Sequence, residues 1–315
     1  MNHQSEIEAS SRPAQPSNSQ PSAARSSAAA FWIKYFFQNA LLALQLLIRG
    51  EFNRVFRSLH ARIHNKVYWL IFPLVTPGRR RRTPLPSSGA VRLLTDHPVA
   101  FASPDHLAPY GTMYNNSTNR RFVLLLDRIV RRDGIQRAPA FLDLGCSGGQ
   151  LVKDFSDLNW RAVGLEGSDY SLKHKRAHWR EMAGKNLFTC DITKPFHLKL
   201  DQQDLKFDLL TAWEVVEHIH PNDLGQLFEN IRSNLAEGGY FIASTASGPS
   251  IQDGIELHQT RMTNSEWKRY IADRYPDLQC ADLGLRTHEY VRYDFGEPSF
   301  LVYRKVADKS ALKPA

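Results

Sequence analysis

Three side chains that can exchange protons or hold metal ions occur close together in the motif Glu214-Val-Val-Glu217-His218. These side chains have i, i+3 and i+4 spacing, so on a helix they would share one face. His258 follows in a loop expected after a later strand. Such a carboxylate and imidazole set can hold a divalent ion that chelates two neighbouring substrate oxygens and lowers the pKa of an attacking hydroxyl. The motif therefore predicts Glu217 and His218 as catalytic residues.

The same four side chains, Glu214, Glu217, His218 and His258, are the predicted ligands of Mg²⁺ or Mn²⁺, and mixed imidazole and carboxylate ligation favours Mn²⁺. Two alternatives need no metal. His218 could act alone as a general base, or it could only orient the substrate that carries the attacking hydroxyl. The sequence leaves this choice open.

A second group of polar residues follows the ends of successive apolar runs. The stretch Phe141–Gly149 ends in a glycine-rich turn before a helix, where small residues let a ligand approach the backbone. Its glycines do not have the G-x-G-x-x-G spacing of dinucleotide sites. Glu166 can accept hydrogen bonds from both hydroxyls of a ribose. Asp191 can accept one from an exocyclic adenine amine, and Ile192 offers a backbone N–H to the ring. Each acid alone could be a helix N-cap, but three sites in order predict an adenosine-containing ligand.

Alternating strand and helix patterns position these residues. Helical spacing of apolar residues predicts a helix that ends near residue 134, one that begins at residue 151, a basic one after residue 165, one that stops at Gly238–Gly239, and one over Ser265–Tyr275. Short apolar runs predict strands at Ala140–Leu144, Ala162–Leu165, Leu187–Cys190, Phe207–Trp213, Tyr240–Ser244, Gln279–Arg286 and Ser299–Val306. This alternation indicates an α/β fold with a parallel sheet and helices on both faces.

Residues 141–149, Glu166, Asp191 and Phe207–Trp213 together resemble the ordered motifs of class I S-adenosylmethionine (SAM)-dependent methyltransferases. The resemblance covers residues 120–306. It implies a Rossmann-like sheet that is mostly parallel with an antiparallel last strand. Ser147 replaces the middle glycine of the family's motif and keeps the turn small.

The resemblance also implies SAM as the cofactor and assigns its binding residues. Asp143, Gly145 and Cys146, in the turn that closes with Gly149, would contact the methionine end of SAM. Glu166 would bind the ribose, and Asp191 and Ile192 would bind the adenine. Trp213 would lie on the methionyl side. The E-x-x-E-H motif with a downstream histidine looks like the metal site of small-RNA 2′-O-methyltransferases. It is also similar to a motif in quinone-biosynthesis O-methyltransferases.

The chain divides by composition into a large domain and a basic N-terminal part. We expect a disordered tail over 1–30, a basic amphipathic helical region over 31–75, a linker over 76–95, the methyltransferase domain over 96–306 and a tail over 307–315. The polar segment 103–119, which we call the lead-in segment, resembles the corresponding segment of methyltransferases associated with glycan assembly. It either covers the cofactor and contacts the acceptor, or is a plain linker.

Residues 31–75 are open to three interpretations. Basic residues beside apolar and aromatic ones suit attachment to an anionic membrane surface. The same pattern fits a helical hairpin packed on the domain or on a partner. A membrane span is disfavoured because Lys34, Gln38, Gln45 and Arg49 interrupt the apolar stretch. Three cysteines without a C-x-x-C pair suit a reducing, cytoplasmic setting, at the inner face of the membrane if the region attaches there.

The distribution of charge narrows the class of molecule that can accept the methyl group. Up to Thr95 the chain has 13 Lys and Arg against 3 Asp and Glu, whereas the remainder has 27 against 29, a net charge of −2. A near-neutral main domain argues against a nucleic-acid groove. We therefore expect methyl transfer to a hydroxyl of a sugar, a glycan or another small acceptor with vicinal oxygens. An RNA 3′-end 2′-O-methyltransferase is the enzymatic alternative. A non-catalytic SAM-binding scaffold is disfavoured by the acids and histidine in the predicted cleft.

Overall fold

The computed structural model describes residues 90–133, 138–284 and 299–307, together with residues 44, 48, 63, 66–68, 70–72 and 74. Several predicted segments lie wholly or mostly outside the described residues: the tail over 1–30, the helical region over 31–75, the linker over 76–95, the C-terminal tail, and the end of the strand predicted at Gln279–Arg286.

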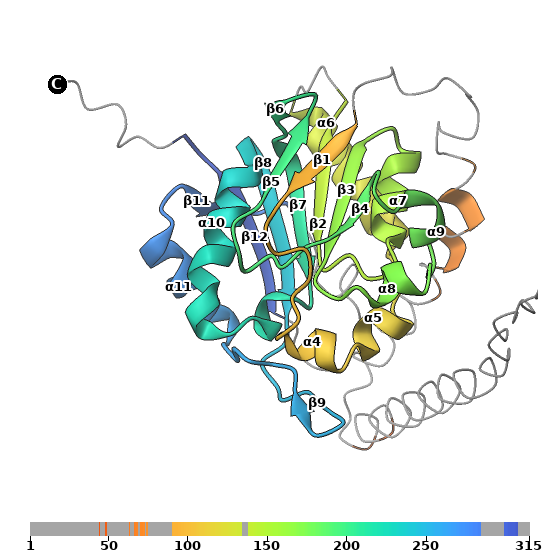
Figure 1. Ribbon diagram of the computed structural model, residues 1–315. Coiled ribbons are helices and arrows are strands. Elements are labelled where there is room, and N and C mark those ends of the chain that lie inside the picture. The colour runs from red at the N-terminus through yellow and green to blue at the C-terminus, as the bar shows by residue number, and fades with distance from the viewer. Residues whose placement is uncertain are drawn as a thin grey trace, which may run out of the picture.

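A seven-stranded sheet forms the centre of the described domain (Figure 1). Its inner strands are buried on both faces, which is why they read as continuous apolar runs. The pairs from β8 to β4 are parallel, whereas β12 is antiparallel to both of its neighbours. The predicted α/β fold with an antiparallel last strand is confirmed. The spatial order is β11 (Leu278–Cys280), β12 (Ser299–Lys305), β8 (Leu235–Thr245), β7 (Phe207–Trp213), β2 (Ala140–Leu144), β3 (Arg161–Glu166), β4 (Leu187–Thr189).

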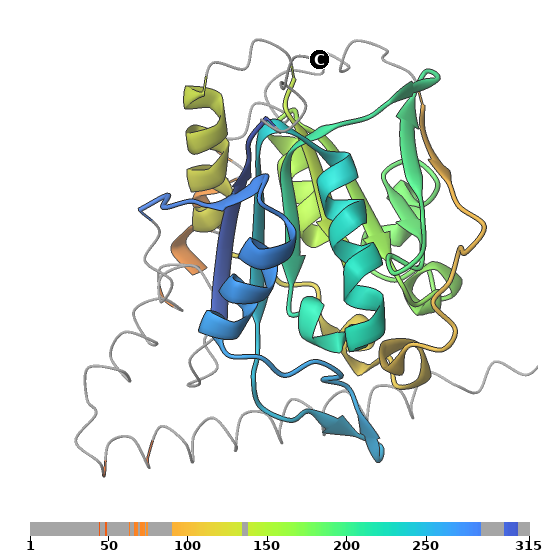
Figure 2. The ribbon, with the colours of Figure 1, turned by 90° about the vertical axis from the view of Figure 1, so that its left-hand side faces the viewer.

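Helices cover both faces of this sheet (Figure 2). On one face α6 (Arg120–Arg132), α7 (Gln150–Asp157) and α9 (Trp179–Met182) pack into one apolar cluster with the strands. On the other face α10 (Leu224–Asn234) and α11 (Asn264–Arg274) pack into a second cluster. The amphipathic patterns of α6 and α10 thus each bury one apolar stripe against the sheet.

The small antiparallel sheet of β1 (Val91–Leu94), β5 (His197–Leu200) and β6 (Gln203–Asp204) was not predicted. Leu198 of β5 is buried in the same cluster as α10. Strand β1 begins before residue 96, where we expected the domain to start. The described part of the domain therefore extends N-terminally beyond that position, and the predicted boundary needs a truncation test.

Two helix predictions differ from the structure. The basic helix expected after β3 is replaced by α8 (Tyr170–Lys173) and α9, because positive φ angles at Lys175 and Ala177 turn the chain between them. The helix expected to stop at Gly238–Gly239 ends at Asn234. Leu235 is already extended there and pairs with Phe207 at the start of β8.

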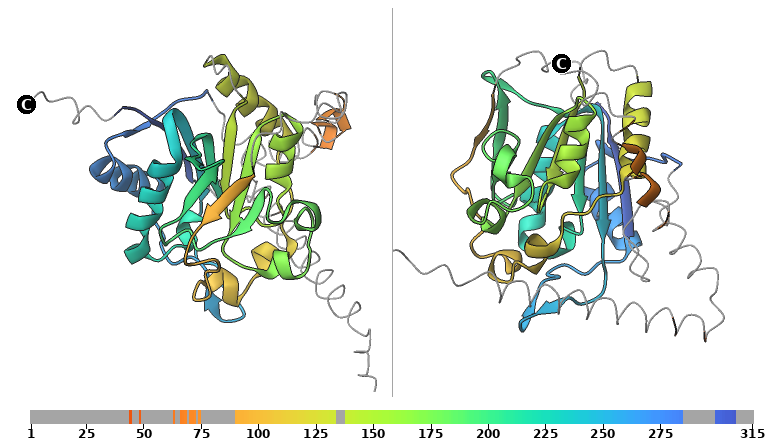
Figure 3. Two further views of the ribbon diagram at one scale, coloured as in Figure 1. Left: turned by 45° about the horizontal axis from the view of Figure 1, so that its top comes forward. Right: turned by 90° about the vertical axis from the view of Figure 1, so that its right-hand side faces the viewer.

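Short elements surround the carboxyl ends of the central strands. The lead-in segment forms α4 (Pro104–Leu107) and α5 (Tyr110–Tyr114), and the hairpin of β9 (Ile251–Gln252) and β10 (Ile255–Glu256) lies beside them (Figures 1 and 3). The 3-10 helices η1 (Val216–His218) and η2 (Pro221–Asp223) complete this edge. These elements are the ones that can enclose a ligand.

The described residues of the predicted helical region over 31–75 include both a buried and several exposed apolar side chains. Phe72 is buried in the α6 and α7 cluster, with the Arg120 guanidinium 4.7 Å from its ring centroid. Within the described part of the chain, no helix combines the length and apolar character needed to cross a bilayer. Seven large apolar side chains are exposed: Leu44, Ile48, Ile63, Val67, Leu70, Ile71 and Leu74.

Candidate active site

A cavity of about 1010 Å³ opens where β2, β3 and β7 end. In open α/β sheets, ligands bind outside the carboxyl ends of the strands. Five of the eight predicted cofactor-binding residues line this cavity, namely Gly145, Glu166, Asp191, Ile192 and Trp213. Glu214, His218 and His258 line it as well, so the two groups of residues found in the sequence face one space.

The other three predicted cofactor residues lie beneath the lining. Asp143 is buried and accepts a hydrogen bond from the Thr211 hydroxyl at 2.7 Å. Burial raises its pKa to about 7, although that hydrogen bond opposes the shift. Cys146 is buried against Gly164, and Gly149 precedes α7 with its Cα facing Leu187. These residues support the turn from below, and a direct contact with a cofactor remains a prediction.

The glycine-rich turn needs its small residues. Gly145 has a φ of +73°, and a Cβ at this position would lie 2.4 Å from Cγ2 of Val215. Ser147 adopts a φ of +47° although it is not glycine. Its backbone N–H donates to Oε2 of Glu166 at 2.6 Å, which fixes the turn against the end of β3.

Glu166 is buried at the end of β3 and receives several hydrogen bonds. The backbone N–H of Ser168 donates to Oε1 at 3.2 Å, and the Thr112 hydroxyl donates to the same oxygen at 3.3 Å. Burial raises the pKa of Glu166, and the backbone donors oppose that shift. Since a carboxylate accepts about four hydrogen bonds, a ribose hydroxyl can join the set or replace the long bond from Thr112.

Asp191 has one oxygen committed to its own turn. Oδ1 accepts from the Thr193 backbone N–H at 2.9 Å and from its hydroxyl at 2.6 Å. Trp213, at the end of β7, has its ring held in place by Phe122 and Phe300, with ring centroids 5.2 and 6.2 Å away. These contacts give the cavity one polar wall and one flat aromatic wall.

The lead-in segment is bonded to the glycine turn. The Ser147 hydroxyl donates to the Asn115 carbonyl oxygen at 2.6 Å. Arg176 donates from Nε to the Met113 carbonyl oxygen at 2.7 Å and from Nη2 to that of Asn115 at 2.6 Å. The Asn116 side chain accepts from the backbone N–H of Gln150 at 3.1 Å. The lead-in segment therefore packs against the glycine turn and lines the cavity, and its contact with a cofactor or an acceptor stays a prediction.

The expectation that Glu214, Glu217 and His218 share a helical face is wrong. The backbone N–H of Glu214 donates to the Ser244 carbonyl oxygen at 3.1 Å and extends the contact of β7 with β8. Its φ of +51° then turns the chain, and η1 begins only at Val216. Glu214 lines the cavity separately from the other two.

Glu217 is fully buried and incompletely bonded. Its Oε1 accepts from the Ala246 backbone N–H at 2.9 Å, whereas Oε2 has no hydrogen-bond partner among the described residues. Burial and the neighbouring charge of Glu214 raise the pKa of Glu217 to about 8. A buried oxygen without a partner is costly, so this atom is suited to a proton or a cation.

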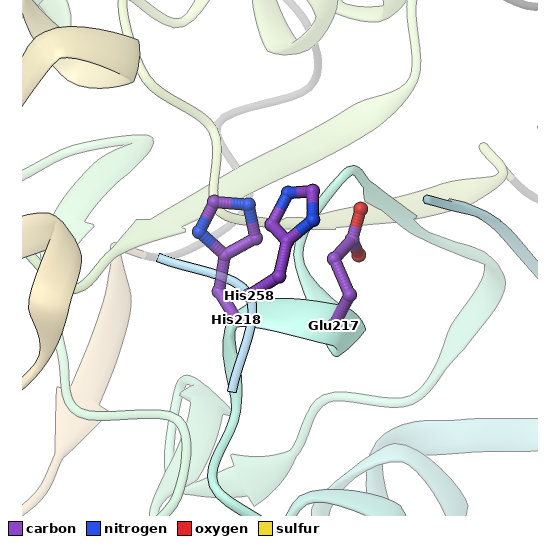
Figure 4. Close-up of side chains that lie close together, drawn as sticks. All are labelled: Glu217, His218 and His258. Atoms are coloured by element: carbon purple, nitrogen blue, oxygen red, sulfur yellow. The ribbon is translucent and has the colours of Figure 1, made fainter. Parts of the chain in front are cut away.

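His218 and His258 meet beside Glu217 (Figure 4). Their ring centroids are 4.9 Å apart, and one ligand atom from each of the three residues lies within 4.8 Å of the others. Nδ1 of His218 lies 2.8 Å from Oδ2 of Asp105, and Nδ1 of His258 lies 2.5 Å from the Gly248 carbonyl oxygen. Three of the four predicted metal ligands thus form a cluster.

The two imidazoles have opposite pKa shifts. Burial alone would lower the pKa of His218, but the hydrogen bond and charge of Asp105, with the charges of Glu217 and Glu214, outweigh burial and raise it. Burial lowers the pKa of His258, and the bond to the Gly248 carbonyl oxygen only partly opposes the shift. Groups with divergent pKa values in one cavity are typical of acid–base sites.

Sequence reasoning missed two features of the site. Asp105, on α4, lies 113 residues before His218, and no spacing rule connects them. Tyr110, on α5, hydrogen-bonds to Asp253 in the β9–β10 turn, which raises the pKa of the tyrosine. A polar, aromatic-rich lead-in segment was the available signal, although it did not identify the individual residues.

Comparison with known proteins identifies the domain. Residues 142–241 match a family model described as a methyltransferase domain, and this range contains the glycine turn, Glu166, Asp191 and the motif around His218. By this match, the chain carries a methyltransferase domain. SAM is the cofactor of this family, and the sheet order described above is the framework that positions the methyltransferase cavity.

Similar curated proteins are named as O-methyltransferases. The chain is 24% identical over 161 residues to a ubiquinone biosynthesis O-methyltransferase of Parvibaculum lavamentivorans, covering 47% of this chain and 59% of that protein. It is 31% identical over 78 residues to one of Idiomarina loihiensis, covering 25% and 31%. The chain thus spans less than two thirds of the curated relatives it matches.

A similar solved structure is a magnesium protoporphyrin IX methyltransferase from Synechocystis PCC 6803 with bound SAH. It is 14% identical, the match covers 65% of this chain and 95% of that one, and the TM-score is 0.41.

Proposed function

We propose that this methyltransferase domain transfers the SAM methyl group to a hydroxyl of a small, uncharged acceptor that carries neighbouring oxygens. The observation that carries the proposal is the cluster of Glu217, His218 and His258 at the cavity. A hydroxyl must lose its proton to become a good nucleophile, and this cluster can take it. The names of the curated relatives, ubiquinone biosynthesis O-methyltransferases, support oxygen as the methylated atom.

The charge of the cavity supports an uncharged acceptor. Among the described residues that line it, five are carboxylic acids and one is a lysine. That lysine, Lys194, already lies 3.2 Å from Asp223. A phosphate backbone would meet repulsion in such a cavity, whereas nucleic-acid sites present cations to phosphates. A sugar, a glycan end or a catechol-like diol fits the charge, and an RNA end fits it less well.

The cofactor supplies an electrophilic methyl group, and the residues of the domain do the rest. Trp213 and the glycine turn shape the methyl-donor end of the cavity, Glu166 and Asp191 offer acceptors for ribose and adenine, and the lead-in segment excludes water. His218 then holds or removes the acceptor's proton. Since the reaction is a displacement between two held partners, alignment and exclusion of water contribute most of the rate.

The cluster also fits a divalent cation. The partnerless oxygen of Glu217 and two imidazoles directed at one space are a mixed oxygen and nitrogen donor set that suits Mn²⁺ or Mg²⁺. A bound ion would lower the pKa of a chelated hydroxyl. With no ion, His218 performs the same task as a general base, and the two forms of the proposal differ in their response to chelators.

Purified full-length protein with methyl-labelled SAM and a panel of acceptors tests the proposal. The panel holds a catechol, a neutral sugar, a short RNA and an amine. We expect a methyl ether on the diol or the sugar by mass spectrometry, and strong loss of product in His218→Gln. His178→Gln is the matched control because His178 pairs with a carboxylate outside the cavity. Transfer to RNA or to the amine alone would contradict the proposal.

The proposal also places residues 31–75 at an anionic membrane surface. Support comes from the seven exposed apolar side chains among its described residues and from its basic sequence. Phe72 supports packing on the domain for the end of the segment. Liposome sedimentation should show binding to anionic vesicles that weakens at high salt. Leu70→Glu with Leu74→Glu should reduce it, and unchanged binding in that variant would refute membrane contact through this surface.

A further inference from the structure

A carboxylate from the lead-in segment contacts the histidine of the proposed site. Oδ2 of Asp105 lies 2.8 Å from Nδ1 of His218, and both side chains are largely covered. Asp105 lies on α4, whereas His218 lies on η1 after the fourth central strand, β7. Two segments far apart in sequence therefore meet at this bond.

This bond selects one form of the His218 ring. A neutral imidazole has one N–H, and a carboxylate can only accept, so Nδ1 carries the hydrogen and Nε2 keeps its lone pair. Glu214 and Glu217 of the same segment and His258 of the loop after β10 are the other titratable groups in contact with His218 or interacting electrostatically with it. His258 is held in the same way, with Nδ1 at the Gly248 carbonyl oxygen.

Asp105 is held in place by the segment that carries it. The Ser103 side chain caps α4 by accepting from the backbone N–H of His106 at 3.1 Å. Before the helix, the backbone N–H of Ala100 donates to the Gly167 carbonyl oxygen at 2.9 Å. After it, Thr112 donates to Glu166. The backbone that carries Asp105 is thus held on both sides at the end of β3.

We propose that Asp105 is the positioning residue of His218. It fixes the ring with Nε2 directed away from α4 and available to the acceptor, either as a proton acceptor or as a ligand atom. Because Asp105 belongs to the lead-in segment, His218 is oriented only while that segment covers the cavity. This inference rests on the proposed function for its catalytic meaning, but the orientation of the ring does not depend on it.

Nuclear magnetic resonance of the full chain labelled with ¹⁵N in histidine tests the orientation directly, on the alkaline side of the His218 titration followed in the same spectra, where the ring is neutral. His218→Gln identifies the signals of His218. We expect an N–H signal at Nδ1 and a lone-pair signal at Nε2 in the wild type. In Asp105→Ala the two signals should move towards each other as the tautomers mix. Unchanged signals in Asp105→Ala would overturn the proposal without any activity assay.

Kinetics then separate positioning from a structural role. Removal of groups that orient such histidines costs about 10- to 100-fold, so Asp105→Ala and Asp105→Asn should lower kcat by that factor. SAM affinity and the unfolding midpoint should stay near wild type. Glu181→Gln is the matched control because Glu181 lies 2.9 Å from Nδ1 of His178 on the surface. A similar fall of kcat in Glu181→Gln, or a parallel loss of SAM affinity in the Asp105 variants, would overturn the assignment.

The two proposals fail in different ways. If no acceptor in the panel is methylated while the ¹⁵N signals of His218 respond to Asp105→Ala, the orientation by Asp105 stands and the proposed acceptor class is wrong. If methylation proceeds and the signals do not respond, the proposed function stands and the role of Asp105 is wrong.

Discussion

Replacing Gly145 by alanine should damage both the fold and the cofactor cavity, for two separable reasons. The φ of +73° costs an L-residue about 1–2 kcal/mol. The added Cβ would also lie 2.4 Å from Cγ2 of Val215, and overpacking of this kind costs about 1–3 kcal/mol. We therefore expect Gly145→Ala to lower the free energy of unfolding by about 2–5 kcal/mol.

Gly184 offers a matched control for the backbone contribution. It has a φ of +70°, but no atom lies within 4 Å of a Cβ built there. Gly184→Ala should therefore cost only the conformational part, about 1–2 kcal/mol. Combining Gly145→Ala with Val215→Ala should recover the steric part, which a double-mutant cycle measures as a coupling energy.

Urea denaturation gives the free energies of unfolding, and calorimetry gives the SAM affinity. Because Gly145 lines the cavity and Gly184 does not, only the former substitution should weaken SAM binding. Equal destabilisation by Gly145→Ala and Gly184→Ala, or a coupling energy of zero with Val215→Ala, would refute the argument from close approach.

Four further results are expected. Glu166→Ala and Asp191→Ala should each weaken SAM binding by about 1.5–3 kcal/mol, the scale of hydrogen bonds to a charged group; unchanged calorimetric affinity in both would remove the cofactor pose. If the cluster holds a metal, chelation should abolish turnover, spare SAM binding and be reversed by Mn²⁺ or Mg²⁺; activity that survives exhaustive chelation would leave the general-base form. Because the pKa of Asp143 rises from 3.8 to about 7 on burial, the folded protein keeps a proton that the unfolded chain releases. Asp143 should therefore lower the free energy of unfolding as pH rises through this range, by at most about 1.4 kcal/mol per pH unit. In urea titrations Asp143→Asn should remove this part of the slope and leave the part that the raised pKa values of Glu166 and Glu217 contribute. A chain beginning at residue 96 loses β1 and should melt below one beginning at residue 90; equal midpoints would show that β1 contributes nothing.

The central sheet could be predicted because its signals are local. The runs at Phe207–Trp213 and Ala140–Leu144 are apolar over their whole length, and the structure has strands with these bounds. Glu166 and Asp191 were found because acids at strand ends are visible in sequence order. The small sheet of β1, β5 and β6 was missed because its strands are two to four residues long and mostly exposed or half-buried, with Leu198 as their one buried residue.

The arrangement inside the cavity could not be predicted to the same depth. The distance from Asp105 to His218 depends on how the lead-in segment packs, which no periodicity reports. Glu214 pairs with Ser244 as a continuation of β7 and then turns the chain with a positive φ, so the expected helical turn does not form there. The type of residue and its place at the end of an element were predictable, whereas the directions of the side chains required the fold.

The hydrogen bonds between the lead-in segment and the glycine turn affect how fast the product of the cofactor can leave. Arg176 donates hydrogen bonds to the backbone carbonyl groups of Met113 and Asn115, and the Ser147 hydroxyl donates a further one to Asn115. A spent nucleoside beneath this segment would leave only after these bonds open together. Opening of this kind is slower than displacement between aligned partners in many enzymes. The domain would then complete its first methyl transfer quickly, and release of the demethylated cofactor would take up most of each later cycle.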